Sequence, residues 1–450
     1  MTAKKTTQRI VYNARPHQMS VLKSDKQIIF LGAGVAAGKT DCGALFVGQK
    51  VRETPDGVLG LIAANTYTQL YDATLKNLYK NLQRFGFNYE PKSLPNSYQP
   101  LKIRIWNGKE WVEILCRSLD HYEALAGVEI GWFWMDEVYQ TKREAFDVVN
   151  ARMRDTRMFN QGLLTTTLDE PTSWMYEVFV EKCDPERMDV FYATTYDNAP
   201  NLPPDFIERM KQTYSPRYFE RMVLAKWVSL ESGQIYYNFD RKVHANHEAE
   251  FVPGIPVCWS LDFNIGTNKP MSSALGQVKR VYREGYGWRQ EMHWFDEIIL
   301  DSSDTNDAAE EARARLSERY VRPNEVRVYG DATGKRNDTR SRKTDYSILR
   351  DHGFGYQYVP KVNPPVRDRH NAMNAMLRTQ DGSVRMLVHP RCGTILKGLE
   401  IGRLKKGAIY AEEETREQHV ITAIGYLVSK EFPVIKPIPA RISEVRMGGN

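Results

Sequence analysis

One segment near the N-terminus has the residue types and spacing of a phosphate-binding loop. An apolar run, residues 28–31, leads into a loop of small residues that ends in a Lys-Thr pair: Gly32, Ala33, Gly34, Val35, Ala36, Ala37, Gly38, Lys39 and Thr40. In such a loop, backbone N–H groups surround the β-phosphate, the lysine reaches the β- and γ-phosphates, and the hydroxyl ligates Mg²⁺. Ala33 stands where the pattern has its first glycine. The segment predicts a site for ATP and Mg²⁺, and the alternative is a chance Gly-Lys-Thr at the start of a helix.

Two consecutive acids, Asp136 and Glu137, end another apolar run, residues 130–135. In a nucleotide site Asp136 would hold the Mg²⁺, and Glu137 would orient the attacking water as general base. The alternative is an ordinary solvated loop that begins with two acids. Because the pair follows the phosphate loop within the same alternating pattern, we favour the catalytic interpretation.

Two flanking features narrow the class of ATPase. Gln18 precedes the first strand, where helicase-like motors carry a glutamine that binds the adenine edge. The segment 165–167 is three threonines, where such motors couple loss of the γ-phosphate to movement, and Thr166 is the predicted nucleotide contact. A run of threonines is also common in ordinary strands, so each feature gains its meaning from the phosphate loop.

Polar residues that suggest a second site lie in the C-terminal half. Asp262 and Asp331 each interrupt an apolar run, which is costly unless a cation or hydrogen bonds compensate the charge. A basic segment follows Asp331, with five cations in ten residues: Lys335, Arg336, Arg340, Arg342 and Lys343. Such cations would neutralise DNA phosphates without selecting a sequence. The alternatives are a turn or cap role for the acids and a merely solvated basic loop.

The elements that must position these residues follow an α/β pattern. In the first half, strands are expected at 27–31, 58–64, 130–135, 162–166 and 188–194, with helices at 39–52, 66–85 and 142–152 between them. This alternation predicts a parallel sheet covered by helices. One helical stretch, 205–227, is expected to close this half.

The second half predicts a ribonuclease-H-like domain. Three β-rich runs, 257–263, 273–283 and 288–300, precede alternating helices and strands. We expect an ATPase domain at 1–230, a linker at 231–255, the second domain at 256–432 and a tail at 433–450.

Composition sets the broad class. The chain of 450 residues is 42% hydrophobic and 26% charged, which is enough for two domains with separate cores. No apolar run approaches the ~20 residues of a membrane helix, and the polar N-terminus does not resemble a secretory signal, so we expect a cytoplasmic protein. The five scattered cysteines support neither a zinc site nor a disulfide framework. The net charge of +6 permits nucleic-acid binding without requiring it.

Taken together, these segments resemble the large terminase subunits that package the genomes of tailed bacteriophages. The phosphate loop, the acidic pair and the threonine segment occur in the family's order and spacing. The segments 117–127, 197–203 and 225–228 also match family motifs. The resemblance implies an ATPase with a ribonuclease-H-like nuclease domain behind it. It further implies a homo-oligomeric ring, a pentamer, that threads double-stranded DNA through the portal protein into a procapsid in the host bacterial cytoplasm, with a small terminase subunit as partner.

The resemblance also assigns residues and exposes one departure. It makes Asp262 and Asp331 ligands of Mg²⁺ or Mn²⁺ in a two-metal nuclease, and the family supplies a third acid from its last helix. Thr422 stands at that position here. His419, one helical turn away, or an acid within 412–414 would substitute, or the nuclease is inactive.

An arginine from a neighbouring subunit commonly completes such ATPase sites. Arg117, Arg152 and Arg154 are the candidates, and the sequence does not rank them. Two other functions remain open: a DNA-translocating ATPase whose nuclease-like domain is an inactive DNA or portal clamp, and a nucleotide-gated assembly protein that moves nothing. The nuclease-like half argues against the latter.

Overall fold

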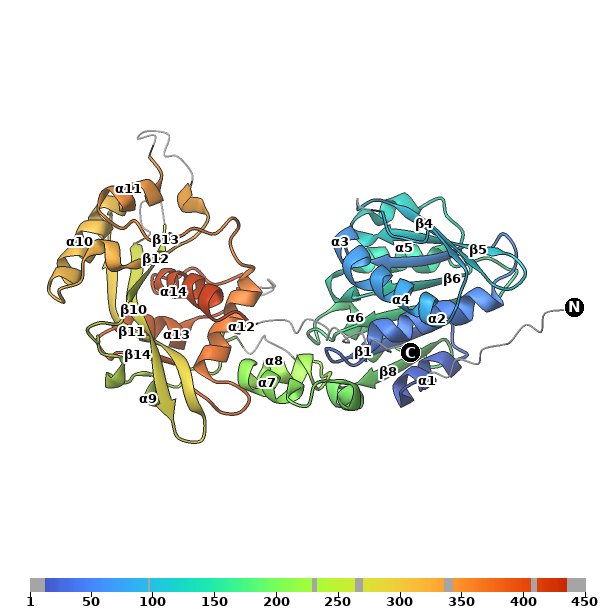
Figure 1. Cartoon of the computed structure of the whole chain (residues 1–450), viewed down its shortest axis with the longest axis horizontal. Coiled ribbons are helices and arrows are strands. Elements are labelled where there is room, and N and C mark those ends of the chain that lie inside the picture. The colour runs from blue at the N-terminus through green and yellow to red at the C-terminus, as the bar shows by residue number, and fades with distance from the viewer. Residues whose placement is uncertain are drawn as a thin grey trace, which may run out of the picture. The chain divides into compact units, whose positions relative to one another are not determined.

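The structure is a computed structural model that describes residues 13–95, 98–228, 233–263, 270–335, 343–405 and 411–434 (Figure 1). The chain forms two compact units. The first contains residues 1–207 and 220–229, and the second contains residues 208–219 and 230–436. From residue 233 onward, the stretch expected to be a linker lies in the second unit and carries α9 (Arg241–His244).

An eight-stranded sheet, ordered β3-β4-β5-β2-β6-β7-β1-β8, forms the centre of the first unit. The strands from β5 to β8 in this order are parallel, and β3 and β4 extend the sheet antiparallel. Along β1, Ile29 and Leu31 pack into one core while Ile28 and Phe30 pack into the other, so both faces of the sheet are buried. The strands are β1 (Ile28–Ala33), β2 (Gly60–Ala64), β3 (Tyr89–Glu90), β4 (Leu101–Trp106), β5 (Trp111–Ser118), β6 (Trp132–Asp136), β7 (Gln161–Thr166) and β8 (Met188–Ala193).

Helices cover both faces of this sheet (Figure 1). The longer ones are α1 (Pro16–Lys23), α2 (Lys39–Glu53), α4 (Lys76–Arg84) and α5 (Arg143–Arg152). The helix expected over 66–85 begins at α3 (Tyr67–Gln69) and passes through a π-helical stretch, η1 (Leu70–Leu75), before α4.

Two expectations for the first unit were wrong. The strands β3, β4 and β5 were not predicted, although β4 alternates buried and exposed residues along its whole length. The stretch 205–227 is not one helix: α7 (Phe206–Thr213) ends before α8 (Pro216–Met222) begins. Pro216 explains the break, because proline lacks an N–H group and disfavours helical geometry in the residue before it.

The second unit is built on a six-stranded sheet, ordered β13-β12-β9-β10-β11-β14. The strands β9, β10 and β11 are antiparallel neighbours, while β12 and β14 run parallel to β9 and β11. This matches the predicted order of three antiparallel strands followed by alternating elements. The strands are β9 (Val257–Asp262), β10 (Met271–Arg283), β11 (Gly287–Leu300), β12 (Arg327–Tyr329), β13 (Gln357–Tyr358) and β14 (Met386–Val388).

Helices again cover both faces. One core gathers residues of α12 (Val366–Leu377), α13 (Gly393–Ile401) and α14 (Gln418–Glu431), and the other gathers residues of α10 (Thr305–Ser317) and α11 (Asp345–Asp351). On β11, Trp294 enters the first core and Phe295 the second, which shows the same alternation between faces.

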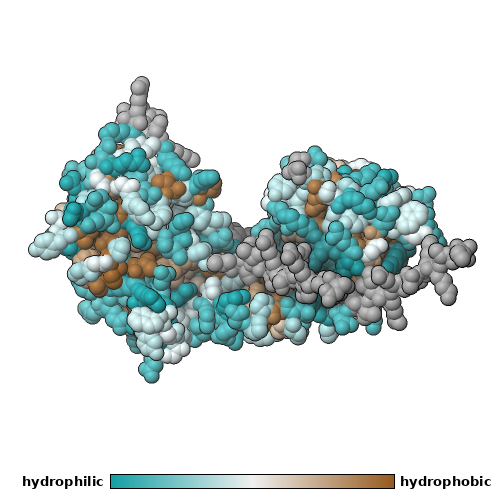
Figure 2. Space-filling model, viewed as in Figure 1, coloured by the Kyte–Doolittle hydropathy of each residue, from teal (hydrophilic) through white to brown (hydrophobic). Residues whose placement is uncertain are grey.

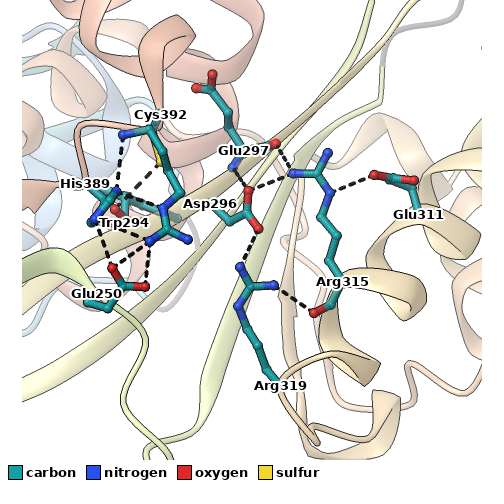
Figure 3. A network of polar contacts seen from close by, with 10 residues as sticks. Glu250, Trp294, Asp296, Glu297, Glu311, Arg315, Arg319, His389 and Cys392 are labelled. Atoms are coloured by element: carbon teal, nitrogen blue, oxygen red, sulfur yellow. Dashed lines mark hydrogen bonds and ion pairs between the residues drawn. The ribbon is translucent and has the colours of Figure 1, made fainter.

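A polar network holds α10 against β11 (Figure 3). Asp296, on β11, accepts hydrogen bonds from Arg315 at 2.7 Å and Arg319 at 2.9 Å. The next residue, Glu297, accepts the N–H groups of Thr394 and Ile395 at the start of α13. Adjacent acids on one strand therefore anchor helices on both faces of the sheet.

The visible surface is mainly hydrophilic, and hydrophobic residues show in patches on the C-terminal unit (Figure 2). Among the described residues, no helix is long and apolar enough to cross a membrane. All five cysteines are free thiols, and four of them are buried.

Candidate active sites

The phosphate loop joins β1 to α2 and leaves the helix N-terminus open. Gly38 precedes α2 with φ of 91°, a left-handed conformation that favours glycine, and no side chain caps the helix. The first N–H groups of α2 therefore face the loop with the positive end of the helix dipole. Lys39 Nζ donates to the carbonyl oxygens of Ala33 and Gly34, at 3.2 and 3.1 Å. A cationic loop with an uncapped helix fits a polyphosphate.

Ala33 causes no strain in place of the expected glycine. It is the last residue of β1, is fully buried and pairs with Ala193 of β8 in extended backbone. Gly34 is where the loop does require glycine. A Cβ there would lie 2.7 Å from the Val223 carbonyl oxygen and 2.8 Å from the Thr195 nitrogen.

Side chains from outside the loop hold three of its carbonyl oxygens. Thr195 Oγ1 donates to Val35 at 2.7 Å, Asn198 donates to Ala36, and Gln18 Nε2 donates to Gly38 at 3.0 Å. Gln18 is fully buried. The predicted adenine-binding residue therefore lies at the loop, with its amide group bonded to the loop backbone.

Asp136 is the last residue of β6 and is fully buried. Its Oδ1 accepts from Thr165 Oγ1 at 2.7 Å, and its Oδ2 accepts from Thr74 Oγ1 at 2.8 Å. Burial, and next the charge of Glu137, raises the pKa of Asp136 to about 6, against these hydrogen bonds and the charge of Lys39. The charge of Lys39 therefore favours the ionised form of Asp136.

Two residues of the threonine segment bond to different parts of the acidic strand and the turn after it. Thr165 lies opposite Asp136 in the β6–β7 register, and its hydroxyl also accepts the Trp134 indole N–H at 2.9 Å. The Thr166 hydroxyl instead accepts from the Tyr139 N–H at 3.0 Å and donates to the Thr167 carbonyl. Of the two, Thr165 is thus the one bonded to the acidic pair, and Thr166 holds the turn after Glu137.

The acids of the C-terminal unit lie on neighbouring strands. Ser260 pairs with Tyr329, so two residues further on Asp262 ends β9 beside Asp331, which lies just past β12. Their exposed fractions are 7% and 5%. Asp331 accepts from Thr333 Oγ1 at 2.7 and 2.8 Å and from the Gly334 N–H at 3.2 Å. Burial raises the pKa of Asp331 against these bonds, and the charge of Asp262 adds to the rise. A cation would relieve the repulsion between the two acids.

Helix α14 completes this site without a third acid. His419 Nδ1 lies 3.2 Å from Asp262 Oδ2, and buried Thr422 follows one turn along the helix. Among the described residues, no group of three or more His, Cys, Asp and Glu side chains is placed to hold a metal ion. The site therefore has two acids, with a histidine on one of them.

Glu412, one of the alternative acids, is engaged elsewhere. It accepts from Arg369 Nη2 at 2.8 Å, pairs with His370 and also accepts from Gln418. Burial opposes its ionisation, but the bond from His370 and the charge of Arg369 hold the pKa of Glu412 at about 2. This carboxylate is committed to a buried cluster, so we exclude it as the replacement for the missing acid.

Comparison with known proteins shows a family similarity in the N-terminal half of the chain. Residues 30–243, just under half of the chain, match the family described as terminase large subunit, T4likevirus-type, N-terminal. These residues are therefore similar to the N-terminal part of large terminase subunits. A search of curated protein sequences found no match.

Solved structures share the fold of this chain. The large terminase of a thermophilic bacteriophage, in one crystal form, is 17% identical with a TM-score of 0.66, covering 93% of this chain and 99% of that one. The same phage protein in complex with ATP-gamma-S gives 18% identity and a TM-score of 0.64, covering 92% and 98%. Its complex with ADP gives 17% and 0.64, covering 93% and 99%. At this identity the likeness establishes the two-part α/β fold, as predicted.

The candidate trans-acting arginines lie at opposite ends of the strands of the first sheet. Arg117 is near the end of β5, on the same edge as Asp136, and its guanidinium donates to the Leu101 and Cys116 carbonyl oxygens. The Arg152 carbonyl accepts the Ile130 N–H, which places this residue at the opposite edge, where β6 begins. Arg154 lies nearby, 3.8 Å from Glu129. The role of each remains a prediction.

Two of the predicted DNA-binding cations lie within the described residues. Lys335 donates to the Pro360 carbonyl oxygen, and Lys343 forms an ion pair with Asp351 at 2.7 Å. Arg336, Arg340 and Arg342 lie outside the described residues.

Sequence reasoning missed Thr74, Thr195 and Asn198. Thr74 lies in the π-helical stretch, which no simple periodicity indicates. Asn198 belongs to a segment, 197–203, that was assigned only to the close of the ATPase domain. Its bond to the loop shows why an Asn-Pro-rich segment occurs there.

Proposed function

We propose that this chain is the ATP-driven motor that moves double-stranded viral DNA into a procapsid, and that its C-terminal unit cuts the DNA. The observation that carries the motor assignment is the junction of three segments at the end of one parallel sheet: the phosphate loop, the acidic pair on β6, and Thr165 on β7, bonded to Asp136. The family match covers all three segments.

We assign the roles at the ATPase site as follows. Gly34 to Thr40 hold the phosphates, and Lys39 neutralises their charge. Thr40 and Asp136 are suited to hold Mg²⁺, which when bound would offset negative charge on the phosphates. Glu137, left-handed at φ of 52°, follows Asp136 directly and serves as the general base that orients water.

The bond between Thr165 and Asp136 supports a coupling role for the threonine segment. Any change in the charge around Asp136 reaches β7 through this bond and the Trp134 indole. Thr165, rather than Thr166, is therefore our candidate for linking hydrolysis to movement.

For the C-terminal unit we propose a nuclease weakened at one metal position. Asp262 and Asp331 are suited to share a Mg²⁺ or Mn²⁺ ion, which would activate water and stabilise the leaving oxygen. Thr422 offers a neutral hydroxyl where a carboxylate is expected, so the second ion binds poorly. The lack of a third acidic ligand among the described residues also favours the second candidate function, an inactive DNA or portal clamp.

Variants of two positions separate these two functions. We expect the full chain to cut duplex DNA slowly with Mn²⁺, Asp331→Asn to abolish cutting, and Thr422→Asp to raise the rate and lower the Mn²⁺ concentration required. DNA-stimulated ATPase measured on the same samples is the control for folding. Cutting by neither the natural chain nor Thr422→Asp, with ATPase intact, would establish the clamp instead.

The proposed motor needs partner proteins and a site of action in the host cell. A ring of this chain on the portal protein, assisted by a small terminase subunit and acting in the host cytoplasm, accounts for a motor with a nuclease-like half. Packaging of DNA into purified procapsids, lost in Glu137→Gln, tests the assembly as a whole. Retained packaging by that variant would contradict a motor driven by this site.

A further inference from the structure

A cavity of about 290 Å³ lies in the C-terminal unit, beside the nuclease acids. Its walls come from the end of β12, from segment 358–364 and from the last turns of α14. Neither the ATPase nor the metal site uses it.

The cavity lies along the face of α14 that carries His419 and Thr422. His419, Thr422 and Tyr426 succeed one another at intervals of three and four residues, so they share one face of the helix. Tyr426 and, one turn further, Ser429 and Lys430 line the cavity. On the other side, Gly330 lines it and immediately precedes Asp331. A group in the cavity would thus lie next to whatever the two acids hold.

The lining is aromatic and apolar with a few polar groups. The rings of Tyr329 and Tyr358 stack with centroids 4.8 Å apart and planes 15° apart. Val362 lines the cavity although 80% of it is exposed. The Ser429 hydroxyl is buried and has no hydrogen-bond partner among the described residues. A ligand in the cavity that hydrogen-bonds to this hydroxyl would remove the cost of leaving it unpaired.

Two lysines lie at or next to the cavity. Lys430 is a lining residue, and Lys335 donates to the carbonyl of Pro360, another lining residue. Ala332 N–H donates to Asn363 Oδ1 at 2.6 Å, so segment 358–364 is tied to the loop that follows Asp331. Cations beside an aromatic cavity favour a ligand that combines a flat ring with a phosphate.

We propose that this cavity receives one unpaired nucleobase of the DNA strand held at Asp262 and Asp331. The proposal rests on the DNA-cutting function proposed above. Nucleobases stack on aromatic side chains whatever their sequence, as a packaging enzyme needs. The volume lies at the lower end of the range of small-ligand sites, roughly 300–1,000 Å³, and so suits a single base with its sugar. Unpairing a base costs least at a strand end or a nick, so the cavity would hold the end of a cut strand.

Photocrosslinking tests the proposal independently of cleavage. The probe is a duplex with a short single-stranded overhang that carries 5-iododeoxyuridine, mixed with the full chain in EDTA, and the crosslinked residue is located by mass spectrometry. We expect crosslinks on Tyr358, Tyr329 or Tyr426. Tyr358→Leu should lower the yield about fivefold or more, because loss of one stack weakens binding by that factor. Tyr320→Leu, at a tyrosine 95% exposed in the same unit, is the matched control and should leave the yield unchanged.

A second variant guards against loss of folding. Val362→Trp fills the cavity from an exposed position and should lower the yield as strongly, with an unchanged melting temperature. Equal yields for both cavity variants and the control would overturn the proposal.

The pattern of crosslinks separates the possible failures. Crosslinks on Lys335 or Lys343 but on none of the three tyrosines would place DNA at the nuclease face and overturn the cavity alone. Equal labelling of Tyr358 by free 5-iododeoxyuridine monophosphate would make the cavity a mononucleotide site and also overturn the proposal. No crosslink in the C-terminal unit, together with no divalent-dependent cutting, would refute the proposed nuclease function itself.

Discussion

Removing one hydroxyl should move the pH dependence of the ATPase. Thr165→Val keeps the shape of the side chain but deletes the donor to Asp136 Oδ1. A hydrogen bond to a charged group contributes about 1.5–3 kcal/mol. At ~1.36 kcal/mol per pH unit, its loss should raise the pKa of Asp136 by about 1 to 2.

The direction of the change in activity follows from the role proposed for Asp136. Asp136 must be ionised to hold Mg²⁺, and its pKa is already raised to about 6. A pKa of about 7 to 8 in the variant lowers the ionised fraction at pH 7 from roughly 90% to about 10–50%. Activity should therefore fall about two- to tenfold at pH 7. It should recover near pH 9, where Asp136 is ionised in both the natural protein and the variant.

The assay is kcat/KM for Mg²⁺-ATP between pH 5.5 and 9, because this ratio reports the pKa values of the free enzyme. Thr165→Ser keeps the hydroxyl and should keep the natural profile. The valine variant also removes the acceptor of the Trp134 indole N–H. Thermal unfolding of both variants therefore shows whether a loss of stability contributes to the change in activity. A valine variant that is equally impaired at every pH would refute the reasoning and leave Thr165 a structural residue only.

Three further predictions concern catalysis, the loop and the second sheet. Glu137→Gln should bind ATP normally but hydrolyse it about 100-fold more slowly or worse, measured by nucleotide binding and single-turnover hydrolysis; near-normal turnover would exclude it as the general base. Gly34→Ala forces a Cβ to within 2.7 Å of a carbonyl oxygen and should weaken ATP binding and destabilise the fold by about 1–3 kcal/mol, whereas Gly355→Ala, with no atom within 4 Å, should change neither. Asp296→Asn removes the carboxylate partner of Arg319 and one of the two carboxylate partners of Arg315, which keeps Glu311, and should lower the free energy of unfolding by about 1–3 kcal/mol in chemical denaturation; an unchanged midpoint would show that the network of Figure 3 is replaceable.

The sequence predicted the parts of the ATPase site that depend on local order. A strand, a loop and a helix start are contiguous, so the positions of Lys39 and Thr40 followed from spacing alone. The side chains that bond to the loop could not be predicted in this way, because Thr195 and Asn198 lie more than 150 residues away from it in the chain. Thr165 and Thr166 show the same limit: both were in the predicted segment, but only the register of β6 against β7 determines which hydroxyl meets Asp136.

The C-terminal site shows what a single departure from a family pattern does and does not reveal. Thr422 was recognisable as a missing acid, but whether a neighbour replaces it depended on tertiary contacts. Glu412 is close in sequence and of the right type, yet Arg369 and His370 hold its carboxylate, and a pKa near 2 shows that these partners already satisfy its charge. His419 faces Asp262, and Thr422, at the position of the family's acid, adds no negative charge. If Asp262 and Asp331 hold metal as proposed, the two-acid site should attract a second divalent ion less strongly than a three-acid site would, and a carboxylate restored at 422 is the smallest change expected to reverse this.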